Sequence, residues 1–211
     1  MNEISNFKLN KVYCMDCLVG LKKIPDNSFD LLFTDPPYFH GNKIISSTQK
    51  DKYDSSWDKE LSQDYFNEML RVSKNGIIFG AEHLSKFLPR SRGWIVWDKR
   101  IKDSESNDFS DCEIIWTSFN NPARIIRYLW NGFRVKHKEK RFHPTQKPLP
   151  LCIDLLKKFT KESDLILDPF MGSGTTAVAC KSLNLKFLGF EKEKKYFDII
   201  NYRLKQTFLP S

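Results

Sequence analysis

The sequence predicts an α/β protein with a doubly wound, mostly parallel sheet, and two observations support this fold class. Short apolar runs alternate with helical patterns along most of the chain, which is typical of strands connected by helices. A glycine-rich turn of the kind that opens a ligand-binding sheet ends at Ala177, and only residues 178–211 follow it. Most of the sheet must therefore precede this turn, so we expect a circularly permuted strand order.

The elements before residue 73 follow this alternation. Val12–Cys14 and Phe29–Thr34 are apolar runs of strand length. Helical patterns are expected at about Cys17–Lys22 and Ser62–Val72. Between them, residues 39–60 carry four Lys and four acidic residues among scattered Ser, Asn and Gly, which predicts a loop.

The middle of the chain adds three apolar runs that predict strands. They lie at about Gly76–Gly80, Trp94–Asp98 and Glu113–Ser118. Residues 99–111 are as polar as the first loop, so we expect a second loop there.

The C-terminal part returns to regular alternation. The elements expected are a helix at Pro150–Thr160, a strand at Leu165–Asp168, a helix at Thr175–Leu183, a strand at Phe187–Glu191 and a helix at Lys194–Lys205. In the last helix, Tyr196, Ile199, Ile200 and Leu204 are spaced by three and four residues, so one face is buried. Pro150 suits a first helical turn, where no backbone donor is needed.

The composition is that of a folded chain. A length of 211 residues favours one domain over residues 1–211, and 40% hydrophobic residues supply its core. There is no apolar run of about 18 residues, and no basic segment followed by an apolar stretch opens the chain. We therefore expect no membrane span and no secretion signal. Five cysteines, an odd number, favour a reducing cytoplasm over a disulfide scaffold.

The net charge of +8 is concentrated in residues 120–147, which hold eight Lys or Arg against a single Glu. Aromatic residues are interleaved with these charges, a pattern typical of a surface that contacts a DNA backbone. The simpler alternative is a solvated basic face. The loops at about 39–60 and 99–142 are the expected recognition loops. The residues expected to contact DNA are Arg124, Arg127, Arg134, Lys136, Lys138, Lys140 and Arg141.

The glycine-rich turn links the strand at Leu165–Asp168 to the helix at Thr175–Leu183. Glycines allow a close backbone approach to a ligand, and a helix start offers free N–H donors to a carboxylate or phosphate. Glu191 ends the next strand, at the place where an acid binds ribose hydroxyls in nucleotide-binding sheets. The turn also fits Gly-x-Gly-x-x-Ala, so a dinucleotide site is a competing interpretation.

A second motif, Asp35-Pro36-Pro37-Tyr38, follows the apolar strand at Phe29–Thr34. In open α/β sheets, ligands bind at the carboxyl ends of the strands. The prolines stiffen the turn and leave carbonyl acceptors, so a carboxylate and a carbonyl can together accept both hydrogens of one NH2 group. Tyr38 can stack on a planar base. The alternative interpretation is a strand end with an incidental acid.

Three motifs together resemble a known family. Residues 35–38 resemble the catalytic motif of amino-group DNA methyltransferases, and residues 168–176 resemble their S-adenosylmethionine motif. Residues 143–148 (His-Pro-Thr-Gln-Lys-Pro) are similar to a segment that contacts the methionine carboxylate in one subgroup. Catalytic motif first and cofactor motif last is the order of the β class of this family, whose fold is a Rossmann-like methyltransferase sheet. The resemblance covers about residues 10–38 and 140–205.

The resemblance implies a role for each matched residue. Asp35 and the carbonyl of Pro36 would bind the target amino group in the turn that Pro37 completes, and Tyr38 would stack on the base. Thr145 and Lys147 would bind the methionine carboxylate. Glu191 would bind the ribose hydroxyls. The residues expected to contact the cofactor are Asp16, Cys17, Asp35, His143, Thr145, Gln146, Lys147, Asp168, Pro169, Phe170, Gly172, Ser173, Gly174, Thr175, Thr176, Glu191 and Lys192.

The implied activity is methyl transfer from S-adenosylmethionine to N6 of adenine in a specific sequence of double-stranded DNA, with the target base flipped out of the duplex. Asp35 in place of Ser favours adenine, and N4 of cytosine is the first alternative. An inactive DNA-binding module is the second, and a dinucleotide oxidoreductase leaves residues 35–38 unexplained. RNA as substrate, a homodimer and a cognate restriction endonuclease stay open. Cys14-x-x-Cys17 has no second pair, so no metal is expected.

Overall fold

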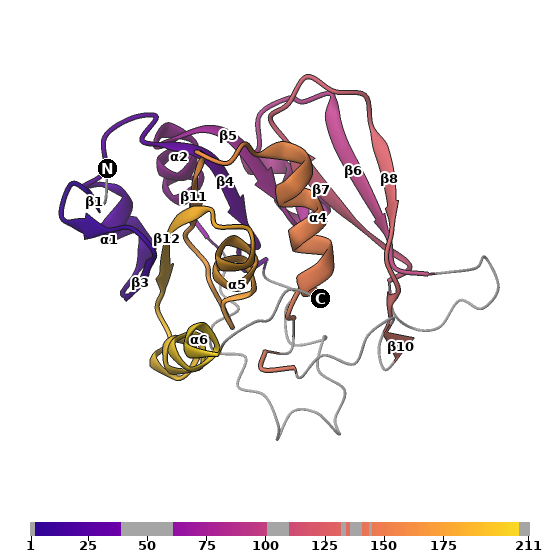
Figure 1. The fold of residues 1–211 in the computed structure, drawn as a ribbon. Coiled ribbons are helices and arrows are strands. Elements are labelled where there is room, and N and C mark those ends of the chain that lie inside the picture. Colours follow the sequence, from indigo (N-terminus) through magenta and orange to yellow (C-terminus); the bar gives the residue numbers. More distant parts are fainter. Residues whose placement is uncertain are drawn as a thin grey trace.

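The computed structural model describes residues 3–38, 61–100, 110–131, 134–135, 141–143 and 145–206, which are built around an eight-stranded sheet (Figure 1). Within this sheet only β7 runs against the other strands, since it pairs antiparallel with both β5 and β6. The predicted fold class, a mostly parallel α/β sheet in permuted order, is confirmed. From one edge to the other the strands are β3 (Lys11–Cys14), β12 (Lys186–Glu191), β11 (Leu165–Asp168), β4 (Phe29–Thr34), β5 (Ser73–Ile78), β7 (Cys112–Thr117), β6 (Gly93–Asp98) and β8 (Arg124–Arg127).

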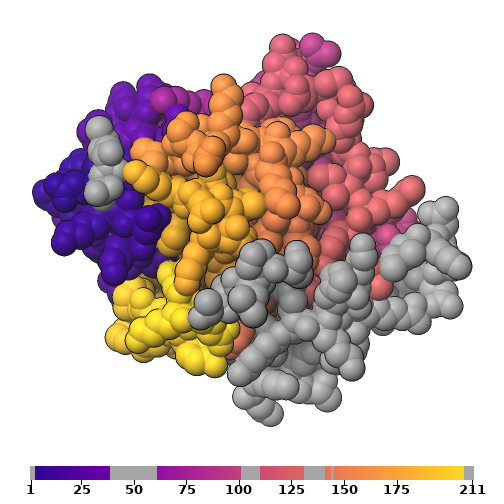
Figure 2. Space-filling view, in the orientation of Figure 1, coloured from indigo at the N-terminus to yellow at the C-terminus, as the bar shows by residue number. Residues whose placement is uncertain are grey.

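The permutation places an N-terminal strand beside the C-terminal strands. β3 pairs with β12, and β11 lies between β12 and β4, so N-terminal and C-terminal strands form one continuous half of the sheet. In the space-filling view the indigo N-terminal residues accordingly adjoin the yellow C-terminal ones (Figure 2). The strands that carry both sequence motifs, β4 and β11, are direct neighbours. Their carboxyl ends are therefore adjacent.

Helices cover both faces of the sheet. They are α1 (Cys17–Leu21), α2 (Gln63–Arg71), α3 (Ala81–Leu84), the short 3-10 turn η2 (Ser85–Phe87), α4 (Leu149–Phe159), α5 (Thr175–Ser182) and α6 (Lys194–Lys205). Figure 1 shows α4 and α5 in front of the sheet and α2 behind it. One buried cluster joins Leu155 and Ile200 to Ile166, and the other joins Phe66 to Leu167. Adjacent strand residues therefore serve opposite cores, which is why the strands are apolar throughout.

Several elements differ from the sequence expectation. The strand expected at Gly76–Gly80 begins earlier, at Ser73, because the polar Asn75 pairs with Leu31 in the parallel ladder. It ends at Ile78, and Gly80 adopts φ +66° before α3. The edge strand β8 was expected only as a basic segment, since most of its side chains are exposed and give no apolar run.

Short elements were not expected at all. β1 (Glu3–Ile4) pairs with β2 (Phe7–Lys8), and β9 (Trp130–Asn131) pairs with β10 (Arg134–Val135), each in a two-stranded sheet. Two-residue strands and a four-residue helix are too short to produce periodicity. The loop expected at 39–60 lies outside the described residues, as do residues 101–109 of the second loop. In the ranges that the structure describes, no helix has the length and apolarity to cross a membrane.

Candidate active site

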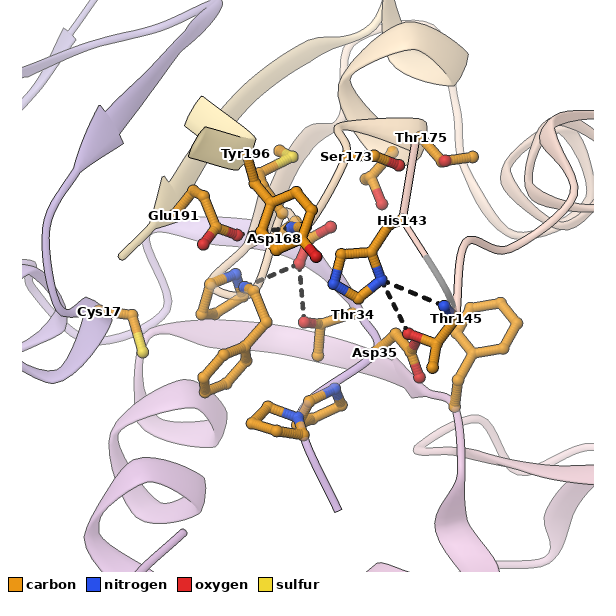
Figure 3. Close-up of a pocket in the computed structure, with 18 of the residues that line it drawn as sticks. Cys17, Thr34, Asp35, His143, Thr145, Asp168, Ser173, Thr175, Glu191 and Tyr196 are labelled. Atoms are coloured by element: carbon orange, nitrogen blue, oxygen red, sulfur yellow. Dashed lines mark hydrogen bonds between the residues drawn. The ribbon is translucent and has the colours of Figure 1, made fainter. Parts of the chain in front are cut away.

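A cavity of about 410 Å³ lies at the carboxyl ends of β3, β12, β11 and β4, where neighbouring strands open into loops (Figure 3). Its volume falls within the range of about 300–1,000 Å³ that is typical of small-molecule sites. The cavity brings both sequence motifs and the 143–147 segment together. The expected site residues that line it are Asp16, Cys17, Asp35, Pro36, Pro37, Tyr38, His143, Thr145, Gln146, Lys147, Asp168, Pro169, Phe170, Gly172, Ser173, Thr175, Thr176, Glu191 and Lys192.

The two glycines of the turn have different surroundings. Gly172 has φ +51°, and a Cβ placed there would meet only His143 Cδ2, at 4.0 Å. Gly174 has φ +85°, and a Cβ there would come within 2.9 Å of Ile200 Cγ1 on α6. Gly174, although expected at the cofactor, does not line the cavity. Gly172 thus leaves room for a ligand, whereas Gly174 lets α6 pack on the turn.

Glu191 ends β12 beside the glycine turn. Its Oε2 accepts a hydrogen bond from the Gly172 N–H at 2.7 Å, and its Oε1 accepts one from the Glu193 N–H at 2.8 Å. Burial raises the pKa of this carboxyl to about 7. Each oxygen of a carboxylate can accept a second hydrogen bond. Glu191 is therefore oriented by the backbone and keeps acceptor capacity for ligand hydroxyls.

Asp168 joins the two motif strands. Its Oδ1 accepts from Thr34 Oγ, at the end of β4, at 2.7 Å and from the Phe170 N–H at 3.0 Å. Burial raises the pKa of Asp168 to about 6, and the hydroxyls of Thr176 and Thr34 oppose that rise. Asp168 thereby fixes the glycine turn relative to the loop that carries Asp35. Sequence reasoning missed Thr34, which reads as an ordinary last residue of a strand.

The 143–147 segment is anchored to the glycine turn. Gln146 Oε1 accepts from Ser173 Oγ and from the Phe142 N–H, both at 3.0 Å. On the other side of the turn, Arg203 of α6 donates to the Ser173 carbonyl at 2.8 Å. Arg203 gave no signal in the sequence, because a lone arginine in an amphipathic helix normally faces solvent.

His143 is held as a neutral ring. Its Nδ1 accepts from the Thr145 N–H at 3.2 Å, shown by a dashed line in Figure 3, and its ring lies 4.3 Å from that of Tyr196. Burial, together with the charges of Lys147 and Lys195, lowers the pKa of His143 to about 4. At pH 7 the ring is therefore uncharged, with its proton on Nε2.

The two carboxyl oxygens of Asp35 differ in whether they have a hydrogen-bond partner among the described residues. Its Oδ2 lies 2.6 Å from Lys147 Nζ. Its Oδ1 is buried and has no hydrogen-bond partner among the described residues. Burial raises the pKa of Asp35 to about 6, and the charge of Lys147 opposes that rise. Asp35 thus lines the cavity and keeps acceptor capacity on Oδ1.

Lys147 is placed differently from its expected role. It lines the cavity, but its Nζ lies against Asp35 and, at 3.3 Å, against Glu113 Oε1 of β7. The binding of a methionine carboxylate by Lys147 stays a prediction. Glu113 was not expected at the site, because it lies at the amino end of a strand and the sequence gives no sign that this strand is reversed.

Tyr38 is held in a fixed plane. Its ring stacks on His83 of α3 with 4.7 Å between ring centroids and 12° between the planes. A Cβ at Gly80 would come within 2.3 Å of Tyr38 Cε1, so the ring also lies directly on that glycine. Neither His83 nor Gly80 gave a sequence signal, since the short α3 was not expected. The backing of the Tyr38 ring leaves it suited to stack on a planar ligand.

The far end of the cavity holds Asp16 and Cys17. Asp16 caps α1 by accepting from the Leu18 N–H at 2.9 Å, and the Tyr65 hydroxyl donates to its Oδ2 at 3.0 Å. Burial raises the pKa of the Cys17 thiol, so this group stays protonated. Within the described ranges no group of three or more His, Cys, Asp or Glu is placed to hold a metal ion.

The basic residues lie apart from the cavity where they are described. Arg124 and Arg127 are exposed on the edge strand β8, and Arg127 Nε lies 3.4 Å from Asp98 Oδ2. The exposed Arg141 stacks its guanidinium over the Trp130 ring at 4.5 Å. Arg134 belongs to β10, and Lys136, Lys138 and Lys140 lie outside the described residues. DNA contact by this window stays a prediction.

Comparisons with known proteins agree on one family. A family model described as DNA methylase matches residues 89–202. The chain is 31% identical to the type II methyltransferase M2.LlaDCHI of Lactococcus lactis subsp. cremoris, over 88% of this chain and 86% of that protein. Its fold matches the M1.HpyAVI–SAM complex with a TM-score of 0.61 and 24% identity, over 92% of this chain and 98% of that one. It also matches the cytosine-N4-specific PvuII DNA methyltransferase with a TM-score of 0.66 and 16% identity, over 95% and 88%.

Proposed function

The chain belongs to the DNA methylase family of N6 and N4 methyltransferases, and from this premise we propose that it methylates N6 of adenine in DNA. The methyl donor is S-adenosylmethionine. The observation that carries the proposal is Asp35, which lines the cavity together with Tyr38 and whose buried Oδ1 has no hydrogen-bond partner among the described residues. A buried oxygen without a partner is costly unless a ligand supplies the donor.

The residues around the cavity fit S-adenosylmethionine. Glu191 keeps free lone pairs for the ribose hydroxyls, and the space beside Gly172 admits a ligand against the backbone. Asp16 and Cys17 would meet the adenine, and the 143–147 segment would face the methionine end. When bound, the cofactor supplies a methyl group activated on a sulfonium. All of these residue roles are proposals.

Asp35, Pro36 and Tyr38 would prepare the target amine. Asp35 Oδ1 and the Pro36 carbonyl accept the two amine hydrogens, which favours a pyramidal nitrogen whose lone pair points at the methyl group. Positive charge grows on the nitrogen during transfer, and the Asp35 carboxylate stabilises it. Tyr38 holds the base plane, and holding both reactants in line supplies much of the remaining acceleration. The base must leave the duplex to reach this cavity.

We also propose the target base and the binding partners of the protein. Asp rather than Ser at position 35 favours adenine, whereas the fold also matches a cytosine-N4-specific enzyme. We place the protein in the cytoplasm, acting on specific sequences of double-stranded DNA through loops at about 39–60 and 99–142. The relative's name as a type II methyltransferase supports a cognate restriction endonuclease as partner. A homodimer is the other proposed assembly, and the mass of the protein in solution tests it.

The test is transfer of labelled methyl from S-adenosylmethionine to mixed genomic DNA, followed by nucleoside analysis. N6-methyladenine is the expected product. N4-methylcytosine as the product would agree with the proposed mechanism but would refute adenine as the target base. Cofactor binding without any methylated nucleoside in DNA would refute the proposed activity, and the same assay on RNA would then identify the substrate.

A further inference from the structure

Glu113 is a buried carboxylate at the active-site edge to which no role has been given. It is the second residue of β7, the strand that runs against its neighbours. Because β7 is reversed, its amino end lies at the same edge as the carboxyl ends of the parallel strands. Its register places Glu113 opposite Trp97 near the end of β6, with Lys99 immediately beyond that strand.

Glu113 links two lysines in a row of alternating charges. Lys99 Nζ lies 3.2 Å from Glu113 Oε2, and Lys147 Nζ lies 3.3 Å from Glu113 Oε1. Lys147 Nζ then reaches Asp35 Oδ2 at 2.6 Å. The two inner side chains are the most buried, with exposed fractions of 6% at Glu113 and 9% at Lys147 against 18% at Lys99 and 22% at Asp35. One ammonium, that of Lys147, is therefore shared by two carboxylates.

Sharing of this kind fixes both the place and the strength of the Lys147 contact. A lysine ammonium is a compact charge on a flexible stem, so a single partner leaves its position loosely defined. Glu113 gives the Lys147 ammonium a second carboxylate partner, which competes with Asp35 for its charge. Lys99 in turn neutralises Glu113 and limits this competition. Removing either member changes how strongly Lys147 acts on Asp35.

We propose that Glu113, balanced by Lys99, is a positioning residue for methyl transfer, which divides Lys147 between two carboxylates and so sets how Asp35 is held as an ionised acceptor. The inference rests on the proposed function, because it gives Asp35 the catalytic role. Glu113 itself acts only through Lys147.

The charged groups around Asp35 give this inference a direction in pH. Lys147 lowers the pKa of Asp35, whereas Glu113 and Asp168 raise it; Tyr38 and Glu113 face Lys147 in turn. Asp35 accepts the amine as a carboxylate, so activity is lost as pH falls through its pKa. Glu113→Gln removes a repelling charge and frees Lys147 for Asp35, which lowers that pKa. Lys99→Met strengthens the hold of Glu113 on Lys147, which raises it.

The experiment compares wild type, Glu113→Gln and Lys99→Met at pH 5 to 8, the range being set by the Asp35 pKa of about 6. The first readout is kcat/KM for methyl transfer to DNA. The second is a ¹³C NMR titration of the Asp35 carboxyl in the protein without cofactor or DNA, assigned with Asp35→Asn. We expect the acid limb and the NMR midpoint to move down in Glu113→Gln and up in Lys99→Met, each by about one pH unit.

Opposite shifts distinguish this role from a structural one, because loss of packing alone would not move a titration in two directions. Unchanged midpoints, or shifts of the same sign, would overturn the inference. If Glu113→Gln fails to fold, the rise in Lys99→Met decides the question, since the Lys99 side chain is more exposed than that of Glu113. The NMR titration needs no methyl transfer, so opposite NMR shifts in a protein inactive on DNA would reject the proposed substrate and retain the charge balance.

Discussion

Asp35→Asn removes the charge of the proposed catalytic carboxylate and keeps its shape. Lys147 Nζ, at 2.6 Å from Oδ2, is a donor that requires an acceptor. The new amide will therefore turn its carbonyl oxygen to Lys147 and place its NH2 where Oδ1 now lies. That NH2 meets another donor, the amine of the target base. The substitution thus loses a charge and also replaces an acceptor by a donor.

The expected loss follows from these two effects. Removing one charge-stabilising group from a reacting centre reduces kcat by about 10²–10³. A buried donor left without an acceptor costs about 1–3 kcal/mol more, which is roughly another tenfold to hundredfold. We therefore expect single-turnover methyl transfer in Asp35→Asn to fall by about 10³–10⁵. Cofactor affinity should change far less, since Asp35 addresses the target amine.

The assay is single-turnover transfer of labelled methyl to DNA, with cofactor binding measured by calorimetry in the same preparation. Asp30→Asn is the matched control: Asp30 is on the same strand β4, and it pairs with Lys74 at 2.7 Å at the opposite edge of the sheet. This control should keep wild-type turnover. Turnover of Asp35→Asn within tenfold of wild type, with the cofactor bound, would refute the mechanism.

Three further predictions concern the turn, its acid and the basic surface. Gly174→Ala should lower the free energy of unfolding, measured in urea, by about 2–5 kcal/mol, because alanine is strained in the left-handed region and its Cβ clashes with Ile200. Gly172→Ala should lower it by only about 1–2 kcal/mol but should weaken cofactor binding. Equal losses of stability in the two variants would contradict this. Burial raises the pKa of Glu191 to about 7, above its value in the unfolded chain, so the contribution of Glu191 to stability falls as pH rises from about 4.5 to 7. Glu191→Gln should therefore reduce the change in the free energy of unfolding in urea between pH 5 and 7.5 by up to about 3 kcal/mol. Arg141→Ala should reduce the salt slope of DNA binding by about one, whereas Lys161→Ala, at the opposite edge of the sheet, should leave it unchanged; identical slopes would place DNA elsewhere.

The sequence was sufficient for those parts of the site that depend on local pattern. Apolar runs in the sequence predict both β4 and β11. The motifs that follow these strands must lie close together, because the carboxyl ends of parallel strands lie at the same edge of the sheet. The permuted strand order could also be predicted, since too few residues follow Ala177 to complete a sheet. The family implied by these motifs is confirmed by the family model and the curated relative.

Contacts that depend on tertiary placement could not be predicted in this way. Glu113 sits at the amino end of its strand, which in a wholly parallel sheet would be the edge away from the cavity. Only the reversal of β7 brings it to Lys147. The cofactor role expected of Gly174 stays a prediction, but nothing in the sequence indicated that its missing side chain makes room for Ile200, on a helix that begins twenty residues later. Neither fact leaves a periodic trace in the sequence.

The charges around the cavity should favour the positively charged cofactor over its neutral product. Asp16, Asp35 and Glu191 line the cavity with Lys147 and Lys192 as the described basic residues among its walls. Burial raises the pKa of Asp35 and Glu191, so both carboxyls would be stabilised by a nearby positive charge. A sulfonium supplies such a charge, and the thioether left after transfer does not. The same burial that raises these pKa values in the free protein should therefore favour the cofactor over its product, and methyl transfer, which removes the sulfonium charge, is the step at which the pKa values rise again.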